Sequence, residues 1–307
     1  MTAWLNRLST RRKVLLGFGF IIGLAILLGA VFGNEGRNND YQPQNEFKLD
    51  PWISIKIGGL DLSINKAVLY LFLASAFTIA VMVWIANRMQ AKPNRVQTAI
   101  EATYDLSRNN ITFGNMDRAY ALKWFPFCAA LFFFIWFSNL LGYLPLPTNS
   151  EEPFHVFGLT IPSFAIYAAT ANISVPLMLT LIVWFSYQVE GVRKHGFFGY
   201  LGTWIPSGVT GFARIPIFGI EVISHFVRII SLSVRLFANL LAGHLLILFM
   251  GGGLVVLLGI AAIGAITVPV AIVFFIFEVV LIATLQAFIF ATLTAIYIGG
   301  ATAAEGH

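Results

Sequence analysis

The last third of the chain limits the possible folds more than any other feature. From Ile217 to Gly300 the sequence is almost continuously apolar, interrupted only by Gly251 to Gly253 and by Pro269. About 20 apolar residues already cross the roughly 30 Å hydrocarbon core of a bilayer. The 307 residues are 58% hydrophobic and 11% charged, against about 45–50% and about 25% in soluble domains. The chain is therefore predicted to be an all-α, polytopic membrane protein with about six membrane helices.

Residues 1–33 form a basic segment followed by an extra transmembrane helix. Four basic residues precede the apolar run from Val14 to Gly33, namely Arg7, Arg11, Arg12 and Lys13. A cleaved secretory signal is the alternative, but the run is long for one and LGAVFGN is a poor cleavage site. We expect the helix to be retained, with its basic end in the cytoplasm.

Residues 34–66 are polar and predict an extracytoplasmic segment with a short strand or loop. Residues 67–307 then form the membrane domain. Further spans are predicted at about 67–86, 125–141 and 161–187, with an acidic outer loop before the last of these. Basic residues mark the cytoplasmic ends, as the positive-inside rule requires: Arg88, Lys92, Arg95, Arg193 and Lys194.

An amphipathic helix is predicted to follow the second span. Asn94 can cap its start, and Val96, Ile100 and Thr103 recur at helical spacing. Such a helix is expected to lie on the membrane surface.

The two helices of the last third are predicted to form a steeply tilted hairpin at about 217–300. A helix from Ile217 to Phe249 would be on the order of 50 Å long, which exceeds the thickness of the hydrocarbon core. It must tilt strongly or lie partly along the membrane. The three glycines predict a helix break, and the second long helix is expected from Pro269 to Gly300.

Polar and small residues form a stripe along the first of these helices. On a helical wheel they fall within a sector of about 120°: Glu221, Ser224, His225, Arg228, Ser231, Arg235, Asn239, Ala242 and Gly243. A charged stripe inside a membrane faces protein or water rather than lipid. His244 lies about 180° from Arg235 on the same wheel, so it addresses a different neighbour.

Titratable residues on the two helices suit proton transfer. His244 and Glu278 are plausible partners across the hairpin, because histidine titrates near neutrality and a partly buried glutamate can shift toward it. Arg235 stays protonated and acts as a fixed charge. Structural readings remain open. Arg235 could pair with a carboxylate, Glu221 and Arg228 could form an interfacial pair, and Asn172 could serve helix packing.

Other kinds of chemistry find no support in the sequence. There is no GxxxxGK[ST], HExxH or GxSxG motif and no cysteine–histidine cluster. The lone Cys128 gives no disulfide framework and no cysteine-pair metal site. We therefore expect no metal and no cofactor. The net charge of +5 comes from basic residues beside apolar runs, which indicates contact with lipid headgroups rather than nucleic acid.

Several motifs resemble the subunit a family of F-type ATP synthases. The strongest are SLSVRLFANLLAGHLLI, which contains Arg235, and LQAFIFATLTAIYI, which contains Gln286. SNLLGYLP around Asn139, ATANIS around Asn172 and PIFGIEVIS around Glu221 add support. The resemblance extends from about residue 65 to the end of the chain.

The resemblance implies a role for each matched residue. Arg235 would face a rotor ring of c subunits between two offset aqueous half-channels, with Asn239 and Gln286 as polar neighbours. His244 and Glu278 would line the outer half-channel, and Glu221 the cytoplasmic one. The proton path would also include Ser231, with Arg228, Asn139 and Asn172 as secondary candidates.

One spacing departs from the family pattern. The second titratable residue usually lies seven positions before the glutamine, whereas Glu278 lies eight before Gln286. One residue turns a helix by about 100°. Unless a π-bulge absorbs the shift, Glu278 does not face His244.

The resemblance also implies a place in a complex. The chain would be the stator subunit of the membrane sector, coupling proton flow to rotation and ATP synthesis. Its partners would be the c-subunit ring, b-type peripheral stalk subunits and, through the complex, the catalytic head. It would be part of an enzyme without binding nucleotide. The location implied is a bacterial inner (plasma) membrane, multi-pass, rather than a mitochondrial one.

Other classes of protein compete with this interpretation. A stand-alone channel or secondary transporter would use the same intramembrane charges, but it often shows an inverted repeat, and none is visible. A structural or assembly subunit would tolerate replacement of Arg235 by lysine. An intramembrane hydrolase lacks any constellation of nucleophile or metal ligands.

Overall fold

The computed structural model describes residues 10–32, 47–49, 51–57, 60–61, 63–90, 93–156, 159–205, 209, 211–258 and 260–303. Five helices among them are long and apolar enough to cross a membrane: Lys66–Arg88, Arg118–Gly142, Ser174–His195, Gly211–Leu258 and Gly264–Ala301. The all-α, polytopic class is confirmed. Helix α2 (Thr10–Phe32) covers the predicted first span, and its crossing of the membrane stays a prediction.

The chain forms two compact units. The first contains Met1–Lys48 and Ala242–Val280, and the second contains Leu49–Leu241 and Leu281–His307. In the first unit, α2 packs on the short helix η6 (Ala261–Ile263) and on α10 (Gly264–Phe277). The division of the sequence at residues 33 and 66 stays a prediction.

Helix α5 (Arg118–Gly142) organises the second unit. It packs against α3 (Lys66–Arg88), the π-helix η2 (Leu106–Phe113) and α11 (Ala283–Ala301). Small residues allow α11 to approach closely, and all of them are buried: Ala283, Ala287, Ala291 and Ala295. Helix α6 (Ser174–His195) packs on α11 and on the short α7 (Phe197–Thr203).

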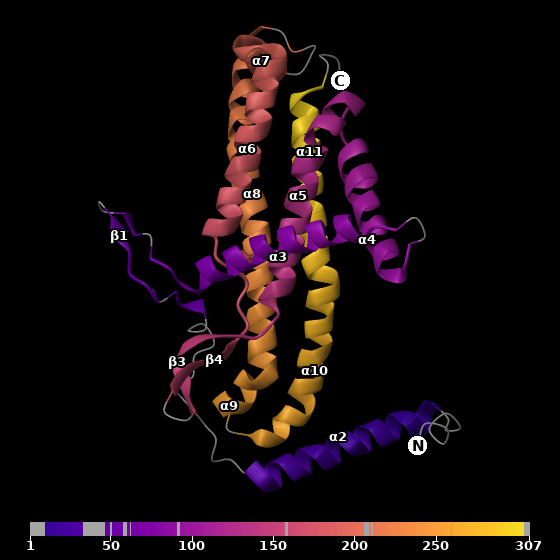
Figure 1. Ribbon diagram of the computed structural model, residues 1–307, viewed down its shortest axis with the longest axis vertical. Coiled ribbons are helices and arrows are strands. Elements are labelled where there is room, and N and C mark those ends of the chain that lie inside the picture. The colour runs from indigo at the N-terminus through magenta and orange to yellow at the C-terminus, as the bar shows by residue number, and fades with distance from the viewer. Residues whose placement is uncertain are drawn as a thin grey trace. The chain divides into compact units, whose positions relative to one another are not determined.

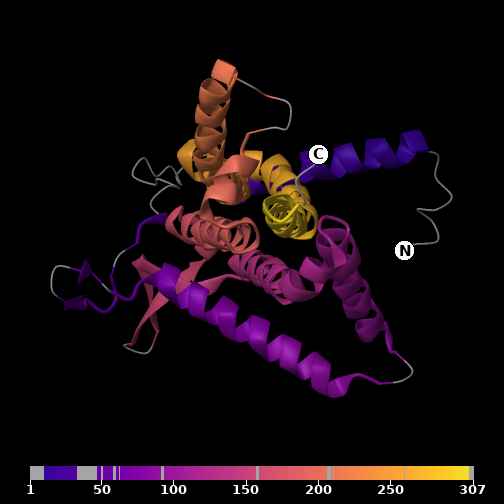
Figure 2. The same cartoon turned by 90° about the horizontal axis from the view of Figure 1, so that it is seen from above.

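Helix α3 runs crosswise to its neighbours. Figures 1 and 2 show α5, α6 and α11 lying side by side, with α3 crossing them steeply. At about 1.5 Å per residue, the 23 residues of α3 measure about 35 Å, which is close to the bilayer thickness. If α3 stands across the bilayer, the helices that it crosses must be strongly tilted.

Side-chain caps fix the starts of two helices. The Asn65 side chain accepts a hydrogen bond from the Val68 amide at 3.1 Å at the start of α3. The Asn94 side chain accepts one from the Gln97 amide at 2.8 Å at the start of α4 (Arg95–Asp105). The predicted second span and the capped helix after it are therefore both confirmed, whereas the position of α4 on the membrane surface stays a prediction.

The predicted span at 161–187 is wrong in its first half. Strand β3 (Leu146–Val156) pairs antiparallel with β4 (Leu159–Ala165), so the acidic segment is part of a hairpin rather than an open loop. The short helix η3 (Ala169–Ala171) follows, and α6 begins only at Ser174. Its first backbone amides need a cap, and the Asn172 side chain accepts a hydrogen bond from the Ser174 amide at 3.0 Å.

The predicted interruptions of the last third are also wrong. Helix α8 (Arg214–Leu248) continues without a break through the π-helix η5 (Phe249–Gly253) into α9 (Leu254–Leu258). Glycine tolerates such irregular backbone because it carries no side chain. Pro269 lies inside α10 rather than at its start, because a membrane helix can absorb the loss of one backbone hydrogen bond.

The predicted extracytoplasmic segment contains the expected strand structure where it is described. Strands β1 (Lys56–Ile57) and β2 (Leu60–Asp61) pair antiparallel, and Ile53 bridges to Ile64. Residues 33–46 lie outside the described residues. The side of the membrane on which this segment lies stays a prediction.

The same substitution is expected to have very different effects at two adjacent glycines near the end of α11. A Cβ atom on Gly299 would lie 2.2 Å from the backbone oxygen of Asn115, whereas one on Gly300 would meet nothing within 4 Å. We expect Gly299→Ala to destabilise the protein by about 1–3 kcal/mol through overpacking. Gly300→Ala should have almost no effect. The measurement is the thermal unfolding midpoint of each purified variant, and equal midpoints would contradict the packing described.

Candidate functional site: an exposed arginine face and a polar cavity

Arg235 lies on a face of α8 that the described residues of its own compact unit leave exposed. The side chains of Ser231, Arg235 and Asn239 are exposed, and so is Ala238 beside them. Leu232, Leu236 and Leu240, on an adjoining face of the helix, are buried. Residues four apart share one face of a helix, so the arginine belongs to a continuous exposed strip, here called the Arg235 face.

The Arg235 guanidinium forms no ion pair within the described part of its compact unit. Its Nη2 donates a hydrogen bond to the Ser231 hydroxyl at 3.4 Å, a long contact one helical turn away. A charge inside a membrane is expensive unless protein or water surrounds it. The Arg235 face therefore needs a partner from outside the described part of its compact unit, or a water-filled space.

Gly243 and Glu278 lie in direct contact within the first unit. An ideal Cβ atom on Gly243 would fall 2.4 Å from Cδ of Glu278 and 2.5 Å from its Oε2. The glycine therefore makes room for the carboxylate against α8. His244, the next residue, is 1% exposed. Both predicted titratable residues thus belong to one packed region, and their direct pairing stays a prediction.

A π-helical turn lies where the spacing departs from the family pattern. The π-helix η7 covers Glu278–Ile282, directly before α11. A π-turn closes its hydrogen bonds over five residues rather than four and so takes up one extra residue. This turn is the feature that the spacing of Glu278 and Gln286 requires.

Side chains of α5 hold the start of α11 just after the π-turn. Asn139 donates a hydrogen bond to the Ala283 carbonyl at 3.3 Å, and its own Oδ1 accepts one from Thr170 at 2.9 Å. The indole of Trp136 donates to the Thr284 hydroxyl at 3.0 Å. Asn139 is completely buried. These contacts give Asn139 a positioning role. Asn172 accepts a hydrogen bond from the Ser174 amide at the start of α6.

Gln286 is buried and Arg235 is exposed. Only 5% of the surface of Gln286 is accessible, and no hydrogen bond joins it to Arg235 within the described residues. Its predicted place beside the arginine stays a prediction.

Replacing Asn139 by alanine is expected to lower stability. The change leaves the Thr170 hydroxyl without its acceptor and the Ala283 carbonyl without one donor, both in a buried environment. An unsatisfied buried polar group costs about 1–3 kcal/mol. The thermal midpoint of the purified variant should therefore fall, whereas Ser186→Ala, at a half-buried position on α6, should leave it nearly unchanged. A midpoint like that of the wild type would contradict the assigned role of Asn139.

Glu221 opens into a polar cavity of about 420 Å³. Its carboxylate Oε1 lies 3.0 Å from Nη2 of Arg228 and 3.8 Å from Nε2 of His225. Arg228 also lies over the ring of Tyr297 on α11, 5.3 Å from its centroid. The structure therefore brings Glu221 and Arg228 together, as the interfacial ion pair requires.

Aromatic side chains that the sequence analysis did not select form the other walls of this cavity. Tyr187 on α6, Tyr200 on α7, and Trp204 after α7 line it together with Tyr297. Burial raises the pKa of Tyr200 above its usual value, so its hydroxyl stays protonated near neutral pH. These aromatic residues come from three separate segments, so no local sequence pattern predicts that they line one cavity. His225 is the exception, because it lies four residues after Glu221 and therefore on the same face of α8.

The sequence analysis also missed an ion pair whose carboxylate is buried. The Lys123 Nζ atom on α5 lies 2.5 Å from Oε1 of Glu190 on α6, and the Glu190 side chain is only 4% exposed. Among the described residues, no group of three histidine, cysteine, aspartate or glutamate side chains could hold a metal ion.

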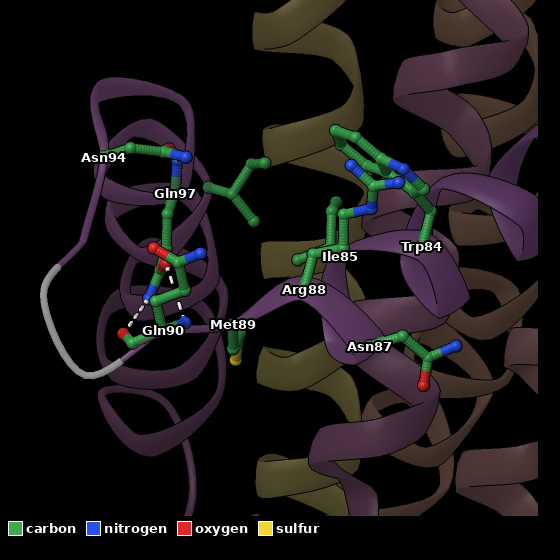
Figure 3. A pocket seen from close by; sticks show the side chains of 9 residues that line it. Trp84, Ile85, Asn87, Arg88, Met89, Gln90, Asn94 and Gln97 are labelled. Carbon is green, nitrogen blue, oxygen red and sulfur yellow. Dashed lines mark hydrogen bonds between the residues drawn. The ribbon is translucent and has the colours of Figure 1, made fainter.

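A second polar cavity, of about 490 Å³, lies where α3 meets α4. Figure 3 shows Gln97 reaching Gln90 and Arg88 beside Trp84. Gln97 donates to the Gln90 carbonyl at 3.0 Å and accepts from the Gln90 amide at 3.1 Å. Tryptophan and arginine are typical anchors at a membrane surface. The hydrogen bonds between Gln90 and Gln97 therefore hold the end of α3 against the start of α4.

The fold and the site define a polytopic α-helical membrane protein that keeps fixed and titratable charges on its membrane helices, as ion-translocating proteins do. The ATP synthase A chain family matches residues 68–299. The chain therefore belongs to this family.

Similar relatives support this assignment over most of the chain. ATP synthase subunit a of Rubrobacter xylanophilus is 34% identical over 82% of this chain and 90% of the relative. ATP synthase subunit a of Rhizobium etli is 33% identical over 86% of this chain and 98% of the relative. ATP synthase subunit a 2 of Prosthecochloris aestuarii is 34% identical over 87% of this chain and 76% of the relative.

Proposed function

We propose that this chain forms two offset half-channels that carry protons to and from the carboxylates of a rotor ring. It is a membrane-sector, proton-channel subunit of an ATP synthase, as its family membership indicates. Coupling of proton flow to rotation would then drive ATP synthesis in a catalytic head that belongs to other chains.

The observation that carries the proposal is the Arg235 face. An arginine that is exposed on an apolar helix, with Ser231, Asn239 and Ala238 around it, needs a partner that carries negative charge. Small neighbours let a second helix approach closely. A carboxylate that arrives and departs on a rotating ring meets both requirements.

The two half-channels are assigned to separate polar regions. The cavity at Glu221 would be the cytoplasmic half-channel, because the basic residues Arg193 and Lys194 end the adjacent helix α6. His244 and Glu278 would line the outer half-channel. Arg235 lies between these positions on α8 and would block a direct proton path between them by its fixed positive charge.

A steep tilt of the long helices supports the same arrangement. Helix α8 has 35 residues and measures about 52 Å, far more than the bilayer core. A strongly tilted α8 can follow the curved side of a ring over a long distance. It can therefore reach both polar regions while Arg235 meets the ring between them.

The proposal includes a c-subunit ring, b-type peripheral stalk subunits and a bacterial inner membrane. The stalk would hold the chain against the torque of the ring. Nucleotide would bind elsewhere in the complex, so the chain contributes to the enzyme through proton transfer alone.

Cysteine cross-linking tests the proposed contact with the ring. Asn239→Cys places a thiol on the Arg235 face, whereas Leu240→Cys places one on the buried face. In complexes with Cys128 replaced by alanine and a cysteine on the outer helix of the ring subunit, we expect a disulfide with residue 239 and none with residue 240. Cross-linking at neither position, or at both equally, would contradict the proposed interface. A stand-alone transporter would yield no ring subunit in the purified complex.

A further inference from the structure

The wall of the Glu221 cavity contains a histidine to which the proposed proton path assigns no role. His225 lies one helical turn after Glu221 and is 5% exposed. Its Nδ1 is hydrogen-bonded to the Tyr187 hydroxyl at 2.9 Å, and its Nε2 lies 3.8 Å from Oε1 of Glu221. The two ring nitrogens therefore have different fixed neighbours, and Nε2 is the one that faces the carboxylate.

Aromatic rings hold the imidazole in this orientation. The centroid of the Trp204 ring lies 4.3 Å from that of the His225 ring. The Tyr187 ring is stacked on the His225 ring, with 5.7 Å between the centroids. An aromatic face near an imidazole stabilises the ring when it carries a positive charge. The surroundings therefore fix the direction of Nε2. Burial and the neighbouring Arg228 charge act against a lasting positive charge on the ring, so a proton taken up there is soon passed on.

The other groups that face His225 are less suited to carrying a proton. Arg228 is a guanidinium, which does not release its proton in proteins. The phenols of Tyr187, Tyr200 and Tyr297 belong to a residue type that ionises near pH 10. Glu221 already lies on the proposed proton path and is the group that exchanges a proton with the ring; its Oε1 accepts a hydrogen bond from Arg228 at 3.0 Å. Histidine is the residue type that exchanges protons around neutral pH, and a neutral ring can accept one at Nε2.

We propose that His225 is a proton-relay residue of the cytoplasmic half-channel, with Tyr187 as its positioning residue. The O–H bond of protonated Glu221 breaks as an N–H bond forms at Nε2, which gives a carboxylate and an imidazolium. Arg228 stabilises the carboxylate that remains. The imidazolium then releases the same proton to water on the cytoplasmic side, and the reverse sequence serves the opposite direction. This inference rests on the proposed function of the Glu221 cavity.

Proton conduction by the membrane sector tests the relay. Inverted vesicles carrying the assembled complex are stripped of the catalytic head, and proton flow under an imposed potential is measured from pH 5.5 to 9 in the outer medium. We expect His225→Gln, which keeps a polar side chain but cannot titrate, to lower the rate about tenfold or more. Its rate should also lose the pH dependence that the wild type shows. Val227→Ala, at an exposed neighbouring position, should behave as the wild type.

Tyr187→Phe provides an independent test, because it keeps the ring contacts and removes only the hydroxyl at Nδ1. We expect this variant to assemble, to conduct a few times more slowly and to show a shifted pH profile. A wild-type rate and profile in both variants would overturn the relay. A loss by the same factor at every pH would also overturn it, since that result indicates a structural role.

A parallel Arg235→Ala sample separates this inference from the proposed function. If coupled pumping survives without Arg235, the proposed function is wrong. If pumping depends on Arg235 but conduction does not depend on His225, only the relay is wrong.

Discussion

Replacing Arg235 by alanine is expected to abolish ATP-driven proton pumping while the complex stays assembled. The side chain is exposed, and among the described residues of its compact unit it makes one long hydrogen bond, to Ser231, so its loss should cost the fold little. At about 4 Å and an effective dielectric constant near 20, the guanidinium would stabilise a rotor carboxylate by about 4 kcal/mol. That corresponds to about three pKa units at 1.36 kcal/mol each. Without it, a protonated carboxyl on the ring would keep its proton as it passes.

Replacement of Arg235 by lysine distinguishes a rotor-facing charge from a docking contact. Lysine keeps a positive charge, but it is a compact, flexible ammonium that can lose its proton in an apolar setting. We expect pumping in this variant to fall nearly as far as in Arg235→Ala. Arg193→Lys, at an exposed position at the end of α6, serves as the matched control and should pump normally. Normal pumping by Arg235→Lys would favour a structural or assembly subunit.

The second large effect is expected at Gly243. An added Cβ atom would overlap the carboxylate of Glu278, with all three nearest atoms at 2.4–2.6 Å. The overlapping atoms form the end of a flexible side chain, so Gly243→Ala should displace the carboxylate without unfolding the helix. Misplacement of a reacting group by about 1 Å can cost roughly a hundredfold in rate. We therefore expect pumping to fall at least tenfold, at wild-type levels of assembled complex.

A double substitution shows whether that loss acts through Glu278. In a Glu278→Gln background the carboxylate charge is already absent, and Gly243→Ala should lower pumping no further. Additive losses would mean that the glycine serves another contact. Gly219→Ala on the same helix meets nothing within 4 Å and should pump at the wild-type rate, which makes it the control for a change of glycine to alanine.

The apolar runs and helix caps were readable from the sequence because both are local signals. The second span, the capped helix after Asn94 and the exposed strip around Arg235 each follow from spacing along a single helix. The hairpin of β3 and β4 was missed because its residues lie beside an apolar run that continues into α6. Pairing between strands depends on contacts that no local pattern specifies.

The π-helical turns and the walls of the Glu221 cavity could not be predicted from local sequence patterns alone. Three glycines favour a bend in water, yet the π-helix η5 keeps the backbone hydrogen-bonded, as an apolar environment demands. The sequence predicted the π-turn at Glu278 only conditionally: the eight-residue spacing between Glu278 and Gln286 requires such a turn if Glu278 is to face His244. Tyr187, Trp204 and Tyr297 reach the Glu221 cavity from three separate segments, so only the tertiary structure brings them together.

The most direct test of the central claim compares pumping and leak in the same inverted vesicles, wild type against Arg235→Ala. ATP-driven pumping is measured first, and passive proton leak is measured after the catalytic head has been stripped. The account predicts that pumping disappears and passive leak rises, because one fixed charge both discharges the ring carboxylates and separates the half-channels. Pumping near the wild-type rate in assembled complexes would contradict it, since Arg235 would then be a structural residue.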